Sequence, residues 1–260
     1  MFAKERQDKI FTMLQQNGAV TTIDLMKTFQ VSIETIRRDL LYMEQNMLLK
    51  RVHGGAVAVT EMMPFHHLDY RVEENNDLKR ILVQNAIPFI KEGDIICIDA
   101  GSTAIVFAEV LKEHFSELIV VTQCLDVLDI LGKYKNFSVI LCGGHFNKRE
   151  NAFSGDLTLE QYSRLHMQKA FLCPGAVSKN FGICDYQQDL AQIQKKIIEC
   201  SDSIYILADS SKFEQKALLK ISDMKPEFTY ITDNQLSPDL KKIYLENQFH
   251  IIQKRRRKRK

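Results

Sequence analysis

The sequence predicts an α/β protein in two parts, a small helical head followed by a larger body built on a mostly parallel sheet. Residues 1–59, the head, contain short amphipathic helices and a hairpin signal, whereas residues 79–253, the body, alternate apolar runs with helical segments. Charge divides the chain in the same way. The formal net charge of +2 separates into +2 over residues 1–59, −7 over 60–253 and +7 over 254–260. A basic head and a basic tail indicate an anionic partner such as nucleic acid.

Composition excludes several classes of protein. Hydrophobic residues make up 45% and charged residues 26% of the chain, which is typical of a globular protein. No apolar run approaches the ~20 residues that span a bilayer, and the polar N-terminus is not a secretory signal, so we expect no membrane partner. The six cysteines are scattered without a CxxC pair. We therefore expect reduced thiols, no metal site, no cofactor and a cytoplasmic location.

Three helices are expected in the head. The first covers residues 3–16, because its apolar residues recur at helical spacing and Asn17-Gly18 supplies a C-terminal cap. A second, short helix is capped by Thr21 or Thr22, and a third is capped by Ser32. Apolar residues of the third helix follow at steps of three or four and form one stripe: Ile33, Ile36, Leu40, Met43 and Met47.

The other side of the third helix is polar, and a hairpin follows it. Its polar residues are Glu34, Thr35, Arg37, Arg38, Tyr42 and Gln45. Residues 48–59 place two β-capable arms around Gly54-Gly55. Helix, turn, polar helix and hairpin together describe a winged helix-turn-helix. In the major groove of DNA, Arg binds a guanine edge with two hydrogen bonds, and Thr contacts a base edge or a methyl group.

The hairpin, or wing, carries Arg51 and His53, which would contact phosphates or the minor groove. The alternative is that Glu34 and Arg38, four residues apart, only form a solvated pair on the helix surface. The combination of helices and hairpin favours DNA binding.

Two strings in this region resemble the signature of the DeoR (deoxyribose-operon-repressor) family of bacterial regulators. They are Ser32-Ile33-Glu34-Thr35-Ile36-Arg37-Arg38-Asp39-Leu40 and Arg51-Val52-His53-Gly54-Gly55-Ala56. In that family they mark the recognition helix and the wing. The residues that we expect at double-stranded operator DNA are Ser32, Glu34, Thr35, Arg37, Arg38, Tyr42, Arg51, His53, Gly54 and Gly55.

Residues 60–78 are expected to form a linker, with some helical content from Leu68 onward. This segment loses apolar periodicity and carries Pro64, the pair His66-His67 and an acidic cluster. No third ligand stands near the two histidines, so exposed linker histidines are favoured over a metal site.

The body alternates strands and helices. Apolar runs at 95–98, 118–121, 139–142, 170–173, 204–208 and 228–231 each stop at a polar or Gly-rich cluster, and helical segments lie at 104–112, 124–132, 157–166, 187–200 and 237–246. A further helix is expected to begin near Leu78. Continuous apolar strands between helices are typical of a parallel sheet that is covered on both faces.

In such sheets ligands bind at the carboxyl ends of the strands, where these clusters stand. Gly101-Ser102-Thr103 precedes a helix, so its backbone N–H groups are suited to a phosphate. Gly143-Gly144 allows close approach of a ligand, and Lys212 supplies a cation. Asp99 and Asp209 would accept hydrogen bonds from sugar hydroxyls. The alternative is that each cluster is simply a turn.

The body also resembles the sensor domain of the DeoR family, which is similar in fold to ribose-5-phosphate isomerases and CoA transferases. The resemblance implies a phosphorylated sugar effector that lowers operator affinity. The residues expected to bind it are Asp99, Gly101, Ser102, Thr103, Thr122, Gln123, Gly143, Gly144, Asp209, Ser210 and Lys212.

The chain departs from the family pattern at three places. Thr122-Gln123-Cys124 replaces T-N-S, Gln168-Lys169 replaces Asp-x, and acidic and Lys positions are replaced around residues 190–194. The phosphate-binding elements are retained, whereas the part that would read the sugar is altered.

We therefore expect a DNA-binding transcriptional regulator, a repressor of a carbohydrate-metabolism operon that a phosphorylated sugar releases from its operator. So small a head predicts a homo-oligomer, dimer or tetramer, on repeated half-sites.

The first alternative is a sugar-phosphate-converting enzyme with an accessory DNA-binding head, because Asp99, Asp209 and Lys212 could abstract a proton; no catalytic residue is assigned. The second is a DNA-binding regulator whose sensor domain has lost its ligand. The basic tail, residues 254–260, is a solvated end or adds non-specific attraction to DNA.

Overall fold

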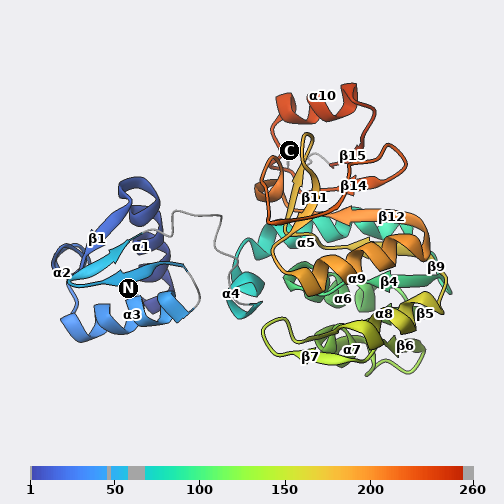
Figure 1. Cartoon of the computed structure of the whole chain (residues 1–260), viewed down its shortest axis with the longest axis horizontal. Coiled ribbons are helices and arrows are strands. Elements are labelled where there is room, and N and C mark those ends of the chain that lie inside the picture. Colours follow the sequence, from blue (N-terminus) through green and yellow to red (C-terminus); the bar gives the residue numbers. More distant parts are fainter. Residues whose placement is uncertain (1, 46–47, 58–67, 254–260) are drawn as a thin grey trace, which may run out of the picture. The chain divides into compact units, whose positions relative to one another are not determined.

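The computed structural model describes residues 2–45, 48–57 and 68–253. The chain divides into two compact units, Met1–Tyr70 and Arg71–Lys260 (Figure 1). The first unit holds the head and the second the body, and each has its own buried apolar core. The predicted tail and residues 60–67 of the predicted linker lie outside the described residues.

The head contains three helices and a three-stranded antiparallel sheet. Its elements are α1 (Ala3–Asn17), β1 (Ala19–Thr21), α2 (Thr22–Phe29), α3 (Ile33–Gln45), β2 (Lys50–Val52) and β3 (Gly55–Val57). Gly18 ends α1 in the left-handed conformation, with φ 73°. Thr21 caps α2, since its hydroxyl accepts from the Asp24 N–H, and the Ser32 hydroxyl accepts from the Thr35 N–H at the start of α3.

The head differs from the sequence prediction in its details. Strand β1, which pairs with β3, was not predicted, because three residues are too few to show an alternating pattern. Ile36, Leu40 and Met43 of α3 are buried, but Ile33, the first residue of the helix, is 38% exposed. The buried stripe of α3 therefore begins at Ile36, and Met47 lies outside the described residues.

The body follows the predicted alternation of strands and helices. Its helices are α4 (Leu68–Glu73, which begins in the first unit), α5 (Asn76–Ala86), η1 (Ile87–Phe89), α6 (Ser102–His114), α7 (Leu125–Leu131), α8 (Asp156–Ser163), α9 (Gln188–Glu199), η2 (Ser210–Lys212) and α10 (Pro238–Glu246). Its strands are β4 (Ile95–Ile98), β5 (Leu118–Thr122), β6 (Phe137–Leu141), β7 (His145–Asn147), β8 (Ala152–Ser154), β9 (Met167–Leu172), β10 (Ala176–Ser178), β11 (Gly182–Asp185), β12 (Ser201–Leu207), β13 (Leu219–Ser222), β14 (Thr229–Ile231) and β15 (His250–Ile252). All six predicted apolar runs are strands of the main sheet.

The main sheet has seven parallel strands in the order β15-β14-β12-β9-β4-β5-β6. The chain runs outward from β4 through β5 to β6 and then returns to β9, on the other side of β4. The strand order therefore reverses between β4 and β9. In open α/β sheets, ligands bind in the crevice at the carboxyl ends of the strands at such a reversal.

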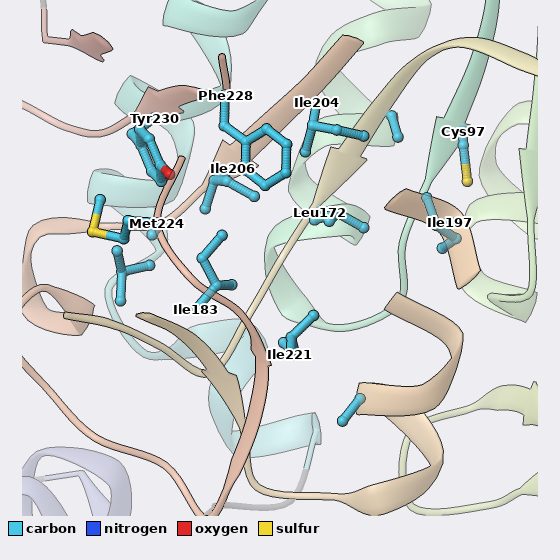
Figure 2. Close-up of a cluster of buried hydrophobic side chains, with 14 of the residues drawn as sticks. Cys97, Leu172, Ile183, Ile197, Ile204, Ile206, Ile221, Met224, Phe228 and Tyr230 are labelled. Atoms are coloured by element: carbon cyan, nitrogen blue, oxygen red, sulfur yellow. The ribbon is translucent and has the colours of Figure 1, made fainter. Parts of the chain in front are cut away.

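Both faces of the sheet are buried, which explains the continuous apolar runs. On one face Phe171 of β9 stacks on Tyr205 of β12, with ring centroids 4.9 Å apart, and also contacts Phe107 of α6. Side chains of the alternate residues point to the other face. Figure 2 shows Leu172, Ile204 and Ile206 there, together with Ile197 of α9 and residues of the small antiparallel sheet β10-β11-β13. No helix of the described residues is both long and apolar enough to span a membrane.

Candidate functional site

The exposed side of α3 carries the residues that were expected to contact DNA. Glu34, Arg37, Arg38 and Tyr42 are exposed, and Thr35 is partly exposed. The ion pair on this surface joins Arg37 and Glu34, with 2.8 Å between nitrogen and oxygen, and not Arg38 and Glu34. Arg38 forms no ion pair with any residue that the structure describes, so its guanidinium is available to a groove.

The wing is held against α3 by Glu44. One carboxylate oxygen of Glu44 accepts from the Arg51 backbone N–H at 2.9 Å, and the other lies 3.1 Å from Arg51 Nε. His53 and Gly54 form the turn, and both are exposed. Gly55 is required by packing, because a Cβ atom there would lie 2.1 Å from the carbonyl oxygen of Val20.

Asp39 orients α3 from its inner side, a role that the sequence analysis missed. Its carboxylate lies 2.5 Å from Arg6 Nε and accepts from Gln7 Nε2 at 3.0 Å, and all three residues are buried. Asp39 follows Arg37-Arg38 directly. With Asp39 fixed inward against α1, the helical period places these two arginines outward.

In the body, Asp99 joins β4 to its neighbours at the crevice. It is fully buried and accepts four hydrogen bonds, from the N–H groups of Ala100 and Cys173 and from the side-chain amides of Gln123 and Gln194, at 2.7–3.0 Å. Burial raises the pKa of the Asp99 carboxyl. Because both oxygens already have two donors, Asp99 holds the crevice together and has no acceptor site left for a sugar hydroxyl.

The start of α6 has the properties of an anion site. Gly101 has φ 106°, a conformation that favours glycine, and no side chain caps the helix. Within the described ranges, no partner is recorded for the N–H groups of Ser102, Thr103 and Ala104. The hydroxyl of Thr103 is also buried and without a partner there. These are donors that a phosphate would satisfy.

One cation, Arg71, lies beside this helix start, and two more follow from it, since Lys79 lies close to both Arg71 and Lys212. Arg71 Nη1 lies 3.6 Å from the position that a Cβ atom on Gly101 would occupy, and its guanidinium pairs with Glu150. Lys212 donates to the carbonyl oxygen of Pro174, at the end of β9, at 3.0 Å. Lys79 is buried and donates to the carbonyl oxygens of Arg71 and Glu74. Burial and the nearby charge of Lys212 lower the pKa of Lys79 to about 8.

Arg71 and Lys79 were not among the predicted site residues, because Arg71 falls within the predicted linker and Lys79 belongs to no cluster at the end of a strand. A signal was present: Lys79 stands three and four residues before Leu82 and Val83 and shares their buried face of α5. A lysine on an apolar face is a candidate for a site, because burying its charge is unfavourable without a partner.

Several predicted effector residues are already bonded within the protein. The Thr122 hydroxyl accepts from the Cys124 N–H, and Asp209 accepts from the Ser211 N–H. Gln123 is fully buried; it donates to Asp99 and accepts from the Tyr162 hydroxyl at 2.5 Å. The N–H of Ser210 donates to Asp233 at 2.6 Å.

Gly143 and Gly144 follow β6, an edge strand that β5 separates from β4. The structure explains Gly144 without a ligand: a Cβ atom there would lie 2.2 Å from the hydroxyl oxygen of Thr158. Nothing lies within 4 Å of a Cβ atom at Gly143.

A buried polar chain extends from Asp99 to Arg71, and the sequence analysis did not identify most of it. Gln194 donates to both Asp99 and Asp185, the Gln187 N–H donates to Asp185, and the Gln187 side chain donates to Glu150 at 2.7 Å. Burial raises the pKa of the carboxyls of Asp185 and Glu150. No cluster of three or more metal-binding side chains occurs among the residues that are described.

The three departures from the family pattern lie at different places. Gln168 accepts from the Ile95 N–H, and Lys169 pairs with Asp94, so both stand at the amino ends of the strands. Gln123 and Gln194, in contrast, bind Asp99 at the carboxyl ends. Two of the three departures therefore stand at the crevice.

Comparison with known families covers both units. Residues 6–62 match the model of the DeoR-like helix-turn-helix domain, and residues 74–234 match that of the DeoR C terminal sensor domain. The chain belongs to the DeoR family. It is a DNA-binding transcriptional regulator with a sensor domain, and not an enzyme, in agreement with the expectation from sequence.

Similar DeoR-type proteins match over nearly their whole length. An uncharacterised HTH-type transcriptional regulator of Bacillus subtilis is 32% identical over 92% of both chains. The L-fucose operon activator of Haemophilus influenzae is 32% identical, over 91% of this chain and 94% of that one. The lactose phosphotransferase system repressor of Lactococcus lactis is 31% identical, over 92% of this chain and 94% of its own.

Among solved structures, ribose 5-phosphate isomerase A of Methanocaldococcus jannaschii matches 54% of this chain and 55% of its own, at 17% identity and a TM-score of 0.39. A likeness at this level carries no argument about what the crevice binds.

Proposed function

We propose that this DeoR-family regulator represses a carbohydrate-metabolism operon and leaves its operator when a phosphorylated sugar binds at the crevice between β4 and β9. The observation that carries the proposal is the uncapped start of α6 with Arg71 beside it, together with Lys79, which lies close to Arg71 and Lys212. Free N–H groups, a helix N-terminus and several cations suit a dianionic phosphate.

The chemistry of the crevice favours phosphate over a neutral ligand. Lys79 is 3% exposed, and its hydrogen bonds to described residues are to carbonyl oxygens; burial and the charge of Lys212 disfavour its charged form despite the nearby Asp209 and Glu74, so an added anion would stabilise it. Bound phosphate would also compete with Glu150 for the Arg71 guanidinium. Arg71 is the first residue of the second unit, so this exchange acts on the segment of chain that leads from the head.

The DNA-facing part of the proposal rests on α3 and the wing. Arg38 supplies the base contact, Arg37 and His53 contact the DNA backbone, and Glu44 sets the position of the wing.

Operons for sugar use are the proposed targets because the similar proteins include a lactose repressor and an L-fucose activator. The protein would act in the cytoplasm as a homo-oligomer, a dimer or tetramer, on repeated half-sites. Sedimentation as a monomer both free and on DNA would contradict the oligomer.

The decisive experiment separates release from DNA binding. Lys212→Ala should leave operator affinity intact and abolish release by sugar phosphates, because it removes a cation of the crevice and none of the head. Lys216→Ala, an exposed lysine of the same loop region, is the matched control and should be released normally. Fluorescence anisotropy of operator DNA measures both properties. Weakened DNA binding with normal release in Lys212→Ala would contradict the site.

A thermal-shift screen of the unmodified protein against inorganic phosphate and sugar phosphates identifies the ligand class. A ligand at ~100 times its dissociation constant adds ~2.7 kcal/mol to stability. The absence of a shift with every one of these ligands would contradict a phosphate site at the start of α6.

A further inference from the structure

The crevice contains two buried carboxylates that no cation touches. Asp99 and Asp185 are 0% and 2% exposed, and the amide nitrogen of Gln194 lies 2.8 Å from one and 3.2 Å from the other. Neither carboxylate forms an ion pair within the part of the chain that the structure describes. A buried charge without a counter-charge is strongly unfavourable.

Gln194 also presents an unused acceptor. Its side chain is buried, and its Oε1 has no hydrogen-bond partner among the residues that the structure describes. The orientation of this amide is fixed by chemistry, because turning it over would place the carbonyl oxygen against two carboxylates. The end of the crevice at Gln194 therefore needs a ligand atom that donates hydrogen bonds.

The cations already present do not balance this end. The charge of Arg71 acts on Asp185, but its guanidinium is paired with Glu150, and Lys79 lies close to Asp209 and Glu74. A bound phosphate would use these cations and add negative charge to a region that already holds Asp99 and Asp185. An effector that carries only a phosphate would leave both carboxylates uncompensated.

We propose that the effector is a phosphorylated amino sugar, with its phosphate at the start of α6 and its ammonium group donating to Gln194 Oε1, where the negative charges of Asp99 and Asp185 attract it without further hydrogen bonds. The inference rests on the proposed function and names the ligand of the same site. Asp99 connects the position of the phosphate with that of the ammonium group. It stands two residues before Gly101, at the start of α6, and its carboxylate accepts a hydrogen bond from Gln194. An ammonium group supplies donors and a positive charge, whereas a hydroxyl supplies only a donor.

The test compares matched pairs of ligands by titration calorimetry with the full-length protein. The pairs are glucosamine 6-phosphate with glucose 6-phosphate, and galactosamine 6-phosphate with galactose 6-phosphate. In at least one pair the amino sugar should bind about tenfold tighter or more, which corresponds to ~1.4 kcal/mol. The N-acetylated sugar phosphate, which has lost the positive charge, should bind no better than the neutral sugar. Equal or tighter binding of the neutral member in both pairs would overturn the inference.

Asp185→Asn tests the position of the ammonium group, since it removes one charge and keeps the shape of the side chain. The preference for the amino sugar should fall severalfold, while the affinity for the neutral sugar phosphate does not fall. Asp239→Asn, at an exposed position in α10, is the control and should keep the full preference. Retained binding of the neutral sugar phosphate shows that the body of each variant is folded. An unchanged preference in folded Asp185→Asn would refute the placement.

Failure of this inference is distinguishable from failure of the proposed function. If sugar phosphates bind and release the operator with no preference for the amine, only the amino-sugar inference falls. If neither inorganic phosphate nor any member of the pairs binds, the phosphate site at α6 falls, and the inference falls with it.

Discussion

At the scale of single residues, the neighbouring arginines Arg37 and Arg38 differ in their partners, since Glu34 neutralises Arg37 and leaves Arg38 to face the solvent. Arg38→Ala should therefore lose ~1–3 kcal/mol of specific operator binding, the range of a two-bond contact to a base. Anisotropy titrations on operator and scrambled DNA measure this loss. Arg80→Ala, an exposed arginine of α5, is the control. Equal losses on the two DNAs would mean that Arg38 contacts phosphate.

The two glycines that follow β6 give a second prediction at this scale. Gly144→Ala should destabilise the body by ~1–3 kcal/mol, because the new Cβ atom would meet the Thr158 hydroxyl and the Ser154 carbonyl oxygen. Gly143→Ala has open space and should be nearly neutral. Urea unfolding of the pair measures the difference. Similar stabilities would show that α8 moves away from Gly144 easily.

At the scale of elements, the placement of α3 depends on the buried pair of Arg6 and Asp39. Asp39→Asn should destabilise the head by ~3–5 kcal/mol, because it takes this carboxylate away from a buried guanidinium. Operator binding should be lost while sugar-phosphate binding persists, since the body has a separate core. Glu5→Gln breaks an exposed pair with Lys9 and should have an effect below ~1 kcal/mol. Loss of both binding activities in Asp39→Asn would contradict independent cores.

The same scale shows what can be predicted from sequence. Apolar runs in the sequence predicted six of the seven strands of the main sheet, all except β15. A strand that is buried on both faces is apolar at successive residues, so it can be recognised in the sequence. Strands such as β1, β7 and β10 were missed, since three residues have no measurable period. The helix-turn-helix was found because its caps and its polar face are local features.

Residues of the crevice were found only in part, for a topological reason. Clusters after strands mark where each strand stops, so the start of α6 and Lys212 were identified. Glu150 stands in the turn between β7 and β8, and Arg71 in a short helix before the sheet. Nothing local indicates that these two residues meet, because the crossover from β6 to β9 brings them together.

At the scale of the whole molecule, the buried carboxyls give the body an unusual response to pH. Burial raises the pKa of Asp99, Asp185 and Glu150, so these groups bind protons in the folded state before they do in the unfolded chain. Their contribution to stability is full below the unfolded pKa of ~4 and is lost as pH rises through the folded values.

The melting temperature of the body should therefore rise as pH is lowered from neutral toward ~5. Calorimetry of the full chain measures this slope, with the transition of the body identified by its shift with sugar phosphate. Asp185→Asn, which cannot titrate at this position, should flatten the slope. A steeper slope in that variant would contradict the assignment.

The return of the chain to β9 beside β4 also orders events during synthesis. The head ends near residue 57 and has a core of its own, so it can fold while most of the body is still unmade. The carboxylate of Asp99 meets its partners only after Cys173 and Gln194 have left the ribosome. A nascent chain thus folds its DNA-binding head well before the crevice that binds the effector, and a polypeptide truncated before β9 would keep a folded head but could not respond to the effector.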